Sequence, residues 1–510
     1  MGPTLRSPRP LARLARFAHL AVLAALVALA AAPSARAQQQ PPPPPPSIDL
    51  ALAGQVFAEI KERCAVDNGR LWGLKLGGPI LLVDPATGTL VANQADPAHE
   101  FLQERDGVFV GTLPDTLQTA NTAVDWAGVR WAMIQWPLPD DPAERCRFVL
   151  HEVFHRVQDE LNLPAHDAVC GHLDTLDGRF WLQLEWRALA EALRQARAVW
   201  EAGDAEQAAP GDPRNAHAAQ PATAARNDAI RDALLFRRAR RALIPGAAER
   251  ERALEMNEGL AEYTGMALRG TAITDTLAVL ADRIVARATS LPSYARSWAY
   301  QSGPAWGLLL DQLAGRDAGP QSWRGGLQQR DDLAELAGAL LRDPPPDTAD
   351  PAGVRALLAA AEKAARTWDG EALRSSEVAR NDVRQAELAR WHALLVEGPL
   401  LELPLSGAMN YTFDPNAVVS LEGAGTVYPT FTLTDSWGSL KAESGALMAA
   451  DHGRTFVAAP TAVDASRAAD SLTDELHGPG WTLKLSAGWH LVLGTRRGDY
   501  LVRSVLADAR

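Results

Sequence analysis

Two histidines four residues apart, with a glutamate between them, are the residues of this chain whose types and spacing best suit chemistry. They lie in the stretch CRFVLHEVFHRVQDEL, where His151, Glu152 and His155 form the pattern H-E-x-x-H. On an α-helix, residues four apart share one face, so both imidazoles can bind one metal ion. Glu152 is rotated by about 100° from His151 and can reach a water molecule beside that ion. The pattern predicts a Zn²⁺ site with Glu152 as general base for hydrolysis.

The residues around the motif predict the helix that would carry it. Asp141 suits the N-cap, Pro142 the first helical position, and Glu144 the position that completes a capping box. Pro164 would end the helix, which we therefore expect over residues 142–162. The alternative is an ordinary amphipathic helix whose two histidines bind nothing.

A catalytic zinc site has three protein ligands, so a third must be found. The stretch ALEMNEGLAEYTGMAL lies in a segment, residues 247–268, with a helical pattern. H-E-x-x-H followed by N-E-G-x-A on a second helix resembles the gluzincin metallopeptidases, particularly the aminopeptidase-N-like branch and its bacterial peptidase MA-like relatives. The resemblance implies Glu258 as the third zinc ligand, with Asn257 beside it and with Glu262 orienting a ligand histidine. Such a carboxylate fixes the imidazole tautomer.

The spacing departs from the family pattern, because about a hundred residues separate His155 from Glu258, far more than those families usually have. Glu185, in LQLEWRALAEAL, is nearer in sequence and is an alternative ligand. Glu262 is a further alternative ligand.

A tyrosine downstream adds to the resemblance. In YQSG, Tyr300 is followed three residues later by Gly303. Aminopeptidase-N-like enzymes have a similar Y-x-x-G segment, which implies that Tyr300 donates a hydrogen bond to the developing oxyanion. A phenol suits this role because it stays neutral at pH 7. Tyr263 and Tyr294 are alternatives for it.

The strand-like stretch GVRWAMIQW precedes the helix. By the same resemblance it would be the edge strand that binds the substrate backbone. A G-x-M-E-N signature, which would indicate recognition of a free N-terminus, is absent from the sequence.

The N-terminus predicts export. Five arginines, an apolar Ala/Leu/Val run and small residues at Ala35 and Ala37 are typical of a signal peptide over residues 1–37. A Pro/Gln-rich linker, residues 38–47, follows. We therefore expect a periplasmic or extracellular protein with no transmembrane segment after cleavage. An uncleaved N-terminal anchor is the alternative.

Charge and cysteine content limit the class further. Removal of residues 1–37 would leave 45 basic and 62 acidic residues, a net charge of −17, which argues against nucleic acid as a partner. We expect the basic run RRARR, residues 237–241, to be a solvated helix face. Three cysteines, Cys64, Cys146 and Cys170, allow at most one disulfide and do not have the spacing of a thiolate zinc site.

The composition predicts an α+β protein with three regions. Residues 48–139 begin with a helix and continue with β-prone runs such as PILLVDPATGTLVA; with residues 140–397, rich in Ala, Leu, Arg and Glu, they would form a zincin-like catalytic region. Residues 203–223 have low complexity and are expected to form an exposed loop. Residues 398–510, which include WTLKLSAGWHLVLG, should form a β domain.

Two functions from different classes follow. The first is an exported zinc metallopeptidase that hydrolyses peptide or protein substrates. The second is a non-catalytic envelope protein with a structural or vestigial zinc site and a ligand-binding C-terminal β domain. A structural site would have a fourth protein ligand, for which His166 or His172 is near enough in sequence.

Overall fold

The structure is a computed structural model that describes residues 48–505 apart from residues 115–116, 167, 210–212, 316–318, 320–321, 344–348, 407–408, 415–416 and 461–474. The expected signal peptide and the Pro/Gln-rich linker lie outside the described residues. Among the described helices, none combines the length and apolar character needed to cross a membrane. The three cysteines are buried and are not disulfide-bonded.

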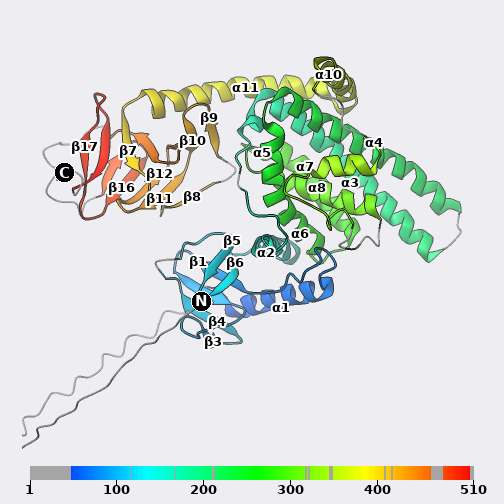
Figure 1. Cartoon of the computed structure of the whole chain (residues 1–510), viewed down its shortest axis with the longest axis horizontal. Helices are drawn as coiled ribbons and strands as arrows, with labels where there is room; N and C mark the ends of the chain where they lie inside the picture. The colour runs from blue at the N-terminus through cyan, green and yellow to red at the C-terminus, as the bar shows by residue number, and fades with distance from the viewer. Residues whose placement is uncertain are drawn as a thin grey trace, which may run out of the picture. The chain divides into compact units, whose positions relative to one another are not determined.

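The predicted α+β class is confirmed, since helices and three sheets share the chain (Figure 1). The first sheet has the strand order β3-β4-β2-β1-β6-β5. It follows helix α1 (Leu50–Asp67) along the chain. Its strands are β1 (Ile80–Asp84), β2 (Thr89–Ala92), β3 (Gln103–Arg105), β4 (Val108–Thr112), β5 (Thr122–Trp126) and β6 (Val129–Gln135).

The stretch predicted as two short β runs around a turn forms the β1–β2 hairpin, in which Leu82 pairs with Val91. Strand β6, in contrast, is not the edge strand that the sequence led us to expect. It pairs in parallel with β1 and antiparallel with β5, so β5 is the outer one of the described strands on that side. The reason is visible in burial: residues 131–134 of β6 are fully buried on both faces, whereas Thr122 and Asp125 of β5 are exposed.

The helical region begins directly after this sheet and runs to residue 397. It consists of α2 (Pro142–Val157), a 3₁₀ turn (Gly171–Asp174), α3 (Leu176–Ala208), α4 (Pro213–Leu243), α5 (Ala247–Leu254), a π turn (Glu255–Gly259), α6 (Leu260–Leu268), α7 (Ile273–Ser290), α8 (Ala299–Ala314), α9 (Leu333–Leu340), α10 (Pro351–Ala365), a 3₁₀ turn (Arg366–Trp368), α11 (Gly370–His392) and a second π turn (Ala393–Glu397).

The prediction of an exposed loop over residues 203–223 is wrong for most of this stretch, because α3 continues to Ala208 and α4 already begins at Pro213. Low complexity here reflects a high alanine content, and alanine has the highest helix propensity of all residues. Pro213 occupies the first helical position, where its missing N–H costs nothing.

Helix α2 begins as predicted. The side chain of its N-cap residue, Asp141, accepts a hydrogen bond of 2.8 Å from the backbone N–H of Glu144, and Pro142 is the first helical residue. The helix ends at Val157, five residues before the predicted end. Residues 158–162 form turns, and Asn162 lies in the left-handed region with φ 58°.

The C-terminal strands form two sheets of orders β17-β18-β7-β14-β13-β10-β9 and β15-β16-β12-β11-β8. The predicted alternation in WTLKL is confirmed, because Trp481, Leu483 and Leu485 are buried in one core. The strands are β7 (Leu400–Pro404), β8 (Asn410–Phe413), β9 (Val419–Leu421), β10 (Gly425–Tyr428), β11 (Phe431–Asp435), β12 (Gly438–Ala442), β13 (Ala446–Ala449), β14 (Arg454–Ala458), β15 (Leu476–Gly478), β16 (Trp481–Leu485), β17 (Trp489–Leu493) and β18 (Tyr500–Ser504).

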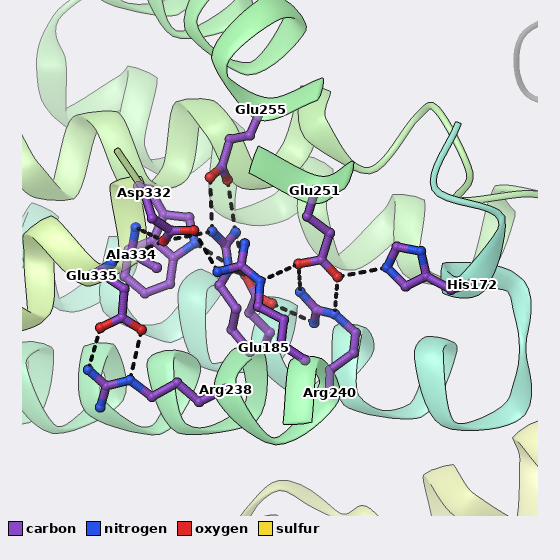
Figure 2. Close-up of polar contacts among 12 residues, drawn as sticks. His172, Glu185, Arg238, Arg240, Glu251, Glu255, Asp332, Ala334 and Glu335 are labelled. Carbon is purple, nitrogen blue, oxygen red and sulfur yellow. Dashed lines mark hydrogen bonds and ion pairs between the residues drawn. The ribbon is translucent and has the colours of Figure 1, made fainter. Parts of the chain in front are cut away.

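Two arginines of the basic run of α4, Arg237 and Arg240, are buried, contrary to the expected solvated face. Arg237 donates to Glu185 of α3 at 2.8 Å and to both oxygens of Glu255 at 2.8 and 2.9 Å. Arg240 donates to Glu185 at 2.7 Å and to both oxygens of Glu251 at 2.8 and 2.9 Å (Figure 2). All five of these side chains are fully buried. The arginines face inward because α3, α5 and the π turn supply the carboxylates that a buried charge requires.

Asp332, at the N-cap of α9, completes this network through ion pairs with Arg241 and Arg237. Burial alone would raise the pKa of its carboxyl group, but the two guanidinium groups outweigh burial and lower the pKa to about 2. A depressed pKa in the folded state stabilises the fold at any pH above the ordinary value, and this stabilisation is lost as the pH falls through the folded-state pKa.

We therefore expect Asp332→Asn to reduce the acid sensitivity of the fold while keeping the N-cap acceptor. The difference in the free energy of unfolding between the two proteins should shrink by about 2 kcal/mol from pH 5 to pH 2. Urea unfolding at several pH values measures it. Asp282→Asn, at an exposed carboxylate on α7, is the matched control, and an equal acid response in all three proteins would contradict the assignment.

Candidate metal centre

The histidines of α2 meet Glu258 of the π turn. The Nε2 atoms of His151 and His155 are 3.2 Å apart. The Oε2 atom of Glu258 lies 3.3 Å from Nε2 of His151 and 3.7 Å from Nε2 of His155. Helix α2 packs along α6, the helix that follows the π turn, so these three side chains converge. Glu258, the predicted third ligand, therefore lies beside both histidines although about a hundred residues separate it from His155 in the sequence.

The spacing of these donor atoms fits a zinc ion. Zinc–ligand distances of about 2.0–2.2 Å in a tetrahedron place neighbouring donor atoms about 3.3–3.6 Å apart. Two neutral imidazoles and one carboxylate are also a donor set that zinc prefers. Within the described part of the chain, this group of potential ligands has three members. Three protein ligands leave a fourth position for water or substrate, which is the arrangement of catalytic rather than structural sites.

The π turn determines where Glu258 points. Residues 255–259 interrupt the helix between α5 and α6, and such single π turns are frequent at functional sites. At its start, Glu255 turns to Arg237 in the buried network. Three residues later, Glu258 faces the histidines. The sequence predicted an uninterrupted helix here, because the hydrophobic pattern carries no signal for one extra residue in a turn.

Glu262 orients His151. One of its oxygens lies 3.1 Å from Nδ1 of His151, and the carboxylate also receives hydrogen bonds from Arg147 and Arg283 at 2.7–2.8 Å. Although burial raises the pKa of Glu262, these two arginines hold it well below its usual range. Burial lowers the pKa of His151, but its hydrogen bonds to Glu258 and Glu262 outweigh burial and raise it to about 10. The group therefore attracts positive charge, as a cation site must.

A second chain of hydrogen bonds orients His155. Its Nδ1 lies 2.8 Å from Oε1 of Gln158, whose amide donates to Oδ1 of Asn257 at 3.1 Å. Asn257 in turn donates to Glu258 at 3.3 Å. Gln158 was not predicted from the sequence, although its position three residues after His155 on the same helical face was a signal for it.

Glu152 lies beside the group with one oxygen unpaired. The side chain is buried, and its Oε2 atom has no hydrogen-bond partner among the described residues. Burial raises the pKa of Glu152, and the two histidines oppose this rise. Glu152 lines an open cavity together with all three potential ligands and with residues 119–123 of the segment that leads into β5. A desolvated, unpaired carboxylate at a cavity wall suits a general base.

Tyr300 of α8 contacts the same group. Its hydroxyl donates to Oε2 of Glu258 at 2.6 Å, and its ring is parallel to that of His151 with centroids 5.5 Å apart. Burial and the negative charge of Glu258 raise its pKa well above the ordinary value, so the phenol remains a donor. The alternatives lie elsewhere, since Tyr263 donates to Asp311 and Tyr294 to the carbonyl of Ala288.

The other alternative ligands are not brought to the group. Glu185 is occupied by Arg237 and Arg240 in the buried network. His172 lies 2.9 Å from Glu251 of the same network (Figure 2), and His166 is exposed. Neither histidine supplies a fourth ligand.

Two glycines lie where the π turn that carries Glu258 contacts α8, the helix that carries Tyr300. Gly259 follows Glu258, and Gly303 follows Tyr300 by one helical turn. The backbones touch there so closely that a Cβ atom on Gly303 would lie 2.2 Å from the Cα of Gly259. No side chain fits at Gly303, so Y-x-x-G needs its glycine, whereas a Cβ atom on Gly259 would lie 3.1 Å from the Cα of Gly303 and make a tight contact.

We therefore expect Gly303→Ala to force α8 away from the π turn. Overpacking of this kind costs about 1–3 kcal/mol of stability, and the displacement should weaken zinc binding. Urea unfolding and zinc titration with a competing chelator measure the two effects. Gly326→Ala, at a position with open space around it, should change neither. Wild-type zinc affinity in Gly303→Ala would show that the contact does not position Glu258.

Comparisons of the chain with protein-family models, with curated proteins and with solved structures found no match. The features that bear on function are accordingly those of the site itself: three converging donor atoms, an unpaired buried carboxylate and a phenol beside them.

Proposed function

We propose that this protein is an exported zinc-dependent metallopeptidase of the gluzincin type, with a zincin-like catalytic region. The observation that carries the proposal is the convergence of His151, His155 and Glu258, whose donor atoms lie 3.2–3.7 Å apart beside the unpaired carboxylate of Glu152. A purely structural zinc site has no use for such a base.

His151, His155 and Glu258 would hold Zn²⁺, which at such a site activates a water molecule and polarises the carbonyl of the scissile bond. Glu152 accepts a proton from the attacking water, whose oxygen adds to the carbonyl carbon. The same carboxyl group then donates that proton to the leaving amine as the C–N bond breaks. The raised pKa of Glu152 suits it to both steps, because it must be a base first and an acid afterwards.

Tyr300 would stabilise the oxyanion that forms on the carbonyl. Its hydroxyl already points at the three potential metal ligands, His151, His155 and Glu258, which we call the metal group, and it donates to Glu258. During the reaction this donor would turn to the negatively charged oxygen. Arg283, which donates to the backbone carbonyl of Tyr300 at 2.9 Å and also holds Glu262, links the tyrosine to the residues that orient His151.

Strand β5 takes the role that the sequence first suggested for β6. Its outer side is free among the described strands, and residues 119–123 line the cavity over the metal group. An extended peptide can add to such an edge through main-chain hydrogen bonds, which bind substrate without selecting its side chains. This mode fits a peptide or protein substrate.

The alternative, a non-catalytic protein with a structural zinc site, lacks a supporting observation. His172 is engaged with Glu251, His166 is exposed, and the described ligand group has three members.

Metal analysis with a peptide-library digest tests the proposal. The wild type and Glu152→Gln should each bind about one zinc ion, because Glu152 is not a ligand, whereas Glu258→Ala should bind zinc far more weakly. Only the wild type should cleave peptides. Glu160→Gln, at an exposed glutamate just beyond α2, is the control for loss of a carboxylate and should retain both properties. A zinc-loaded wild type that cleaves no peptide would favour the binding-protein alternative.

Tyr300→Phe removes the hydroxyl and keeps the ring against His151. We expect kcat to fall about 10²–10³-fold, as for the loss of other oxyanion donors, with zinc content and KM little changed. Steady-state kinetics on one cleaved peptide measure the effect. Tyr294→Phe, which loses a hydroxyl away from the metal group, is the matched control. An unchanged kcat in Tyr300→Phe would exclude the role.

A further inference from the structure

Arginines surround the proposed reaction centre. Five of them line the cavity over the metal group: Arg130, Arg147, Arg283, Arg287 and Arg296. Five acidic residues line it too, among them Glu152, Glu258 and Glu262, so the lining is formally neutral. A bound Zn²⁺ would make it positive by two charges, in a protein whose net charge is −12.

Arg130, Arg147 and Arg283 are each engaged by carboxylates. Arg147 pairs with Glu144 and Glu262. Arg283 pairs with the second oxygen of Glu262. Arg130 pairs with Asp125 and Asp159, both on its exposed side. Because carboxylates already neutralise these three arginines, we do not expect them to bind an anionic group of a ligand.

Arg287 differs from them. It lies one helical turn after Arg283 on α7 and one turn before Leu291, and all three line the cavity from one face of that helix. The side chain of Arg287 is exposed and has no hydrogen bond or ion pair with any described side chain. Its guanidinium group is therefore available at the wall of the cavity.

Arg296 reinforces this wall. It precedes Tyr300 by four residues and lines the same cavity. Two arginines thus line the cavity on the side of α7 and of the turn that leads into α8. Main-chain binding along β5 does not select side chains, so selectivity would come from other residues that line the cavity, such as Arg287.

We infer that Arg287, supported by the charge of Arg296, binds a carboxylate of the substrate close to the scissile bond, so that the enzyme prefers peptides with an acidic side chain or a free C-terminal carboxylate there. The inference rests on the proposed peptidase function and names its substrate class. A guanidinium group suits this role because its donors match both oxygens of a carboxylate.

A matched peptide series tests the inference and separates the two sources of the carboxylate. One peptide that the wild type cleaves is synthesised with Gln, Glu or Lys at each position beside the scissile bond, and each is made with a free or an amidated C-terminus. The wild type should have a kcat/KM for the best acidic peptide about five- to tenfold above that of its Gln counterpart, as expected for a partly exposed charge pair.

Arg287→Gln should reduce this ratio to about one, and Arg287→Glu should invert it in favour of the Lys peptide. Arg355→Gln, at an exposed arginine of α10, should keep the wild-type ratio. Binding gives an independent measurement: fluorescence anisotropy of labelled Glu and Gln peptides on Glu152→Gln, with and without Arg287→Gln, should show the same preference in Kd without turnover.

The outcomes distinguish the two levels of the proposal. Cleavage with equal acidic-to-neutral ratios in the wild type and Arg287→Glu would overturn the inference and leave the peptidase function standing. A preference that depends on the free C-terminus alone, and is lost in Arg287→Gln, would identify a carboxypeptidase-like mode. No cleavage of any peptide by the zinc-loaded wild type would overturn both.

Discussion

Burial of two arginines of α4 is the constraint on which the ligand geometry depends. Arg237 and Arg240 are inside the helical core, and each needs carboxylates around it, which α3, α5 and the π turn provide. Helices α3 and α4 form most of the sequence between the histidines and Glu258. The ion pairs of Arg237 and Arg240 connect these two helices to the π turn that carries Glu258. These two helices therefore help to hold in place the turn that carries Glu258.

One helical turn thus serves two electrostatic centres. Glu255 compensates the buried Arg237, and Glu258, three residues later, faces the imidazoles. A regular α-helix puts residues three apart on nearly the same face, so one turn that serves groups on different sides needs the extra residue of the π turn. Gly259 then lets α8 approach closely enough to bring Tyr300 to Glu258.

Local patterns of the sequence predicted the parts of the structure that depend on neighbours in the chain. The cap at Asp141, the β1–β2 hairpin and the alternation from Trp481 to Leu485 are of this kind. Convergence of Glu258 and Tyr300 was predicted only through short motifs. The π turn, the buried face of RRARR and the edge position of β5 depend on contacts between distant segments, for which composition gives no signal. The contact of Gln158 with His155 could have been predicted from their spacing of three residues on one helix, but it was not.

In the proposed reaction, the hydrogen bond from Tyr300 to Glu258 would link the three potential metal ligands to the oxyanion that forms on the substrate. In the structure, Oε2 of Glu258 is the atom nearest to both histidines and also the acceptor of the phenol. That oxygen would be a weaker acceptor with a cation bound at the three donors, whereas a developing oxyanion is a stronger acceptor. The phenol should then exchange one partner for the other as charge moves to the substrate. Stabilisation that arises only when the oxyanion forms lowers the barrier without strengthening ground-state binding.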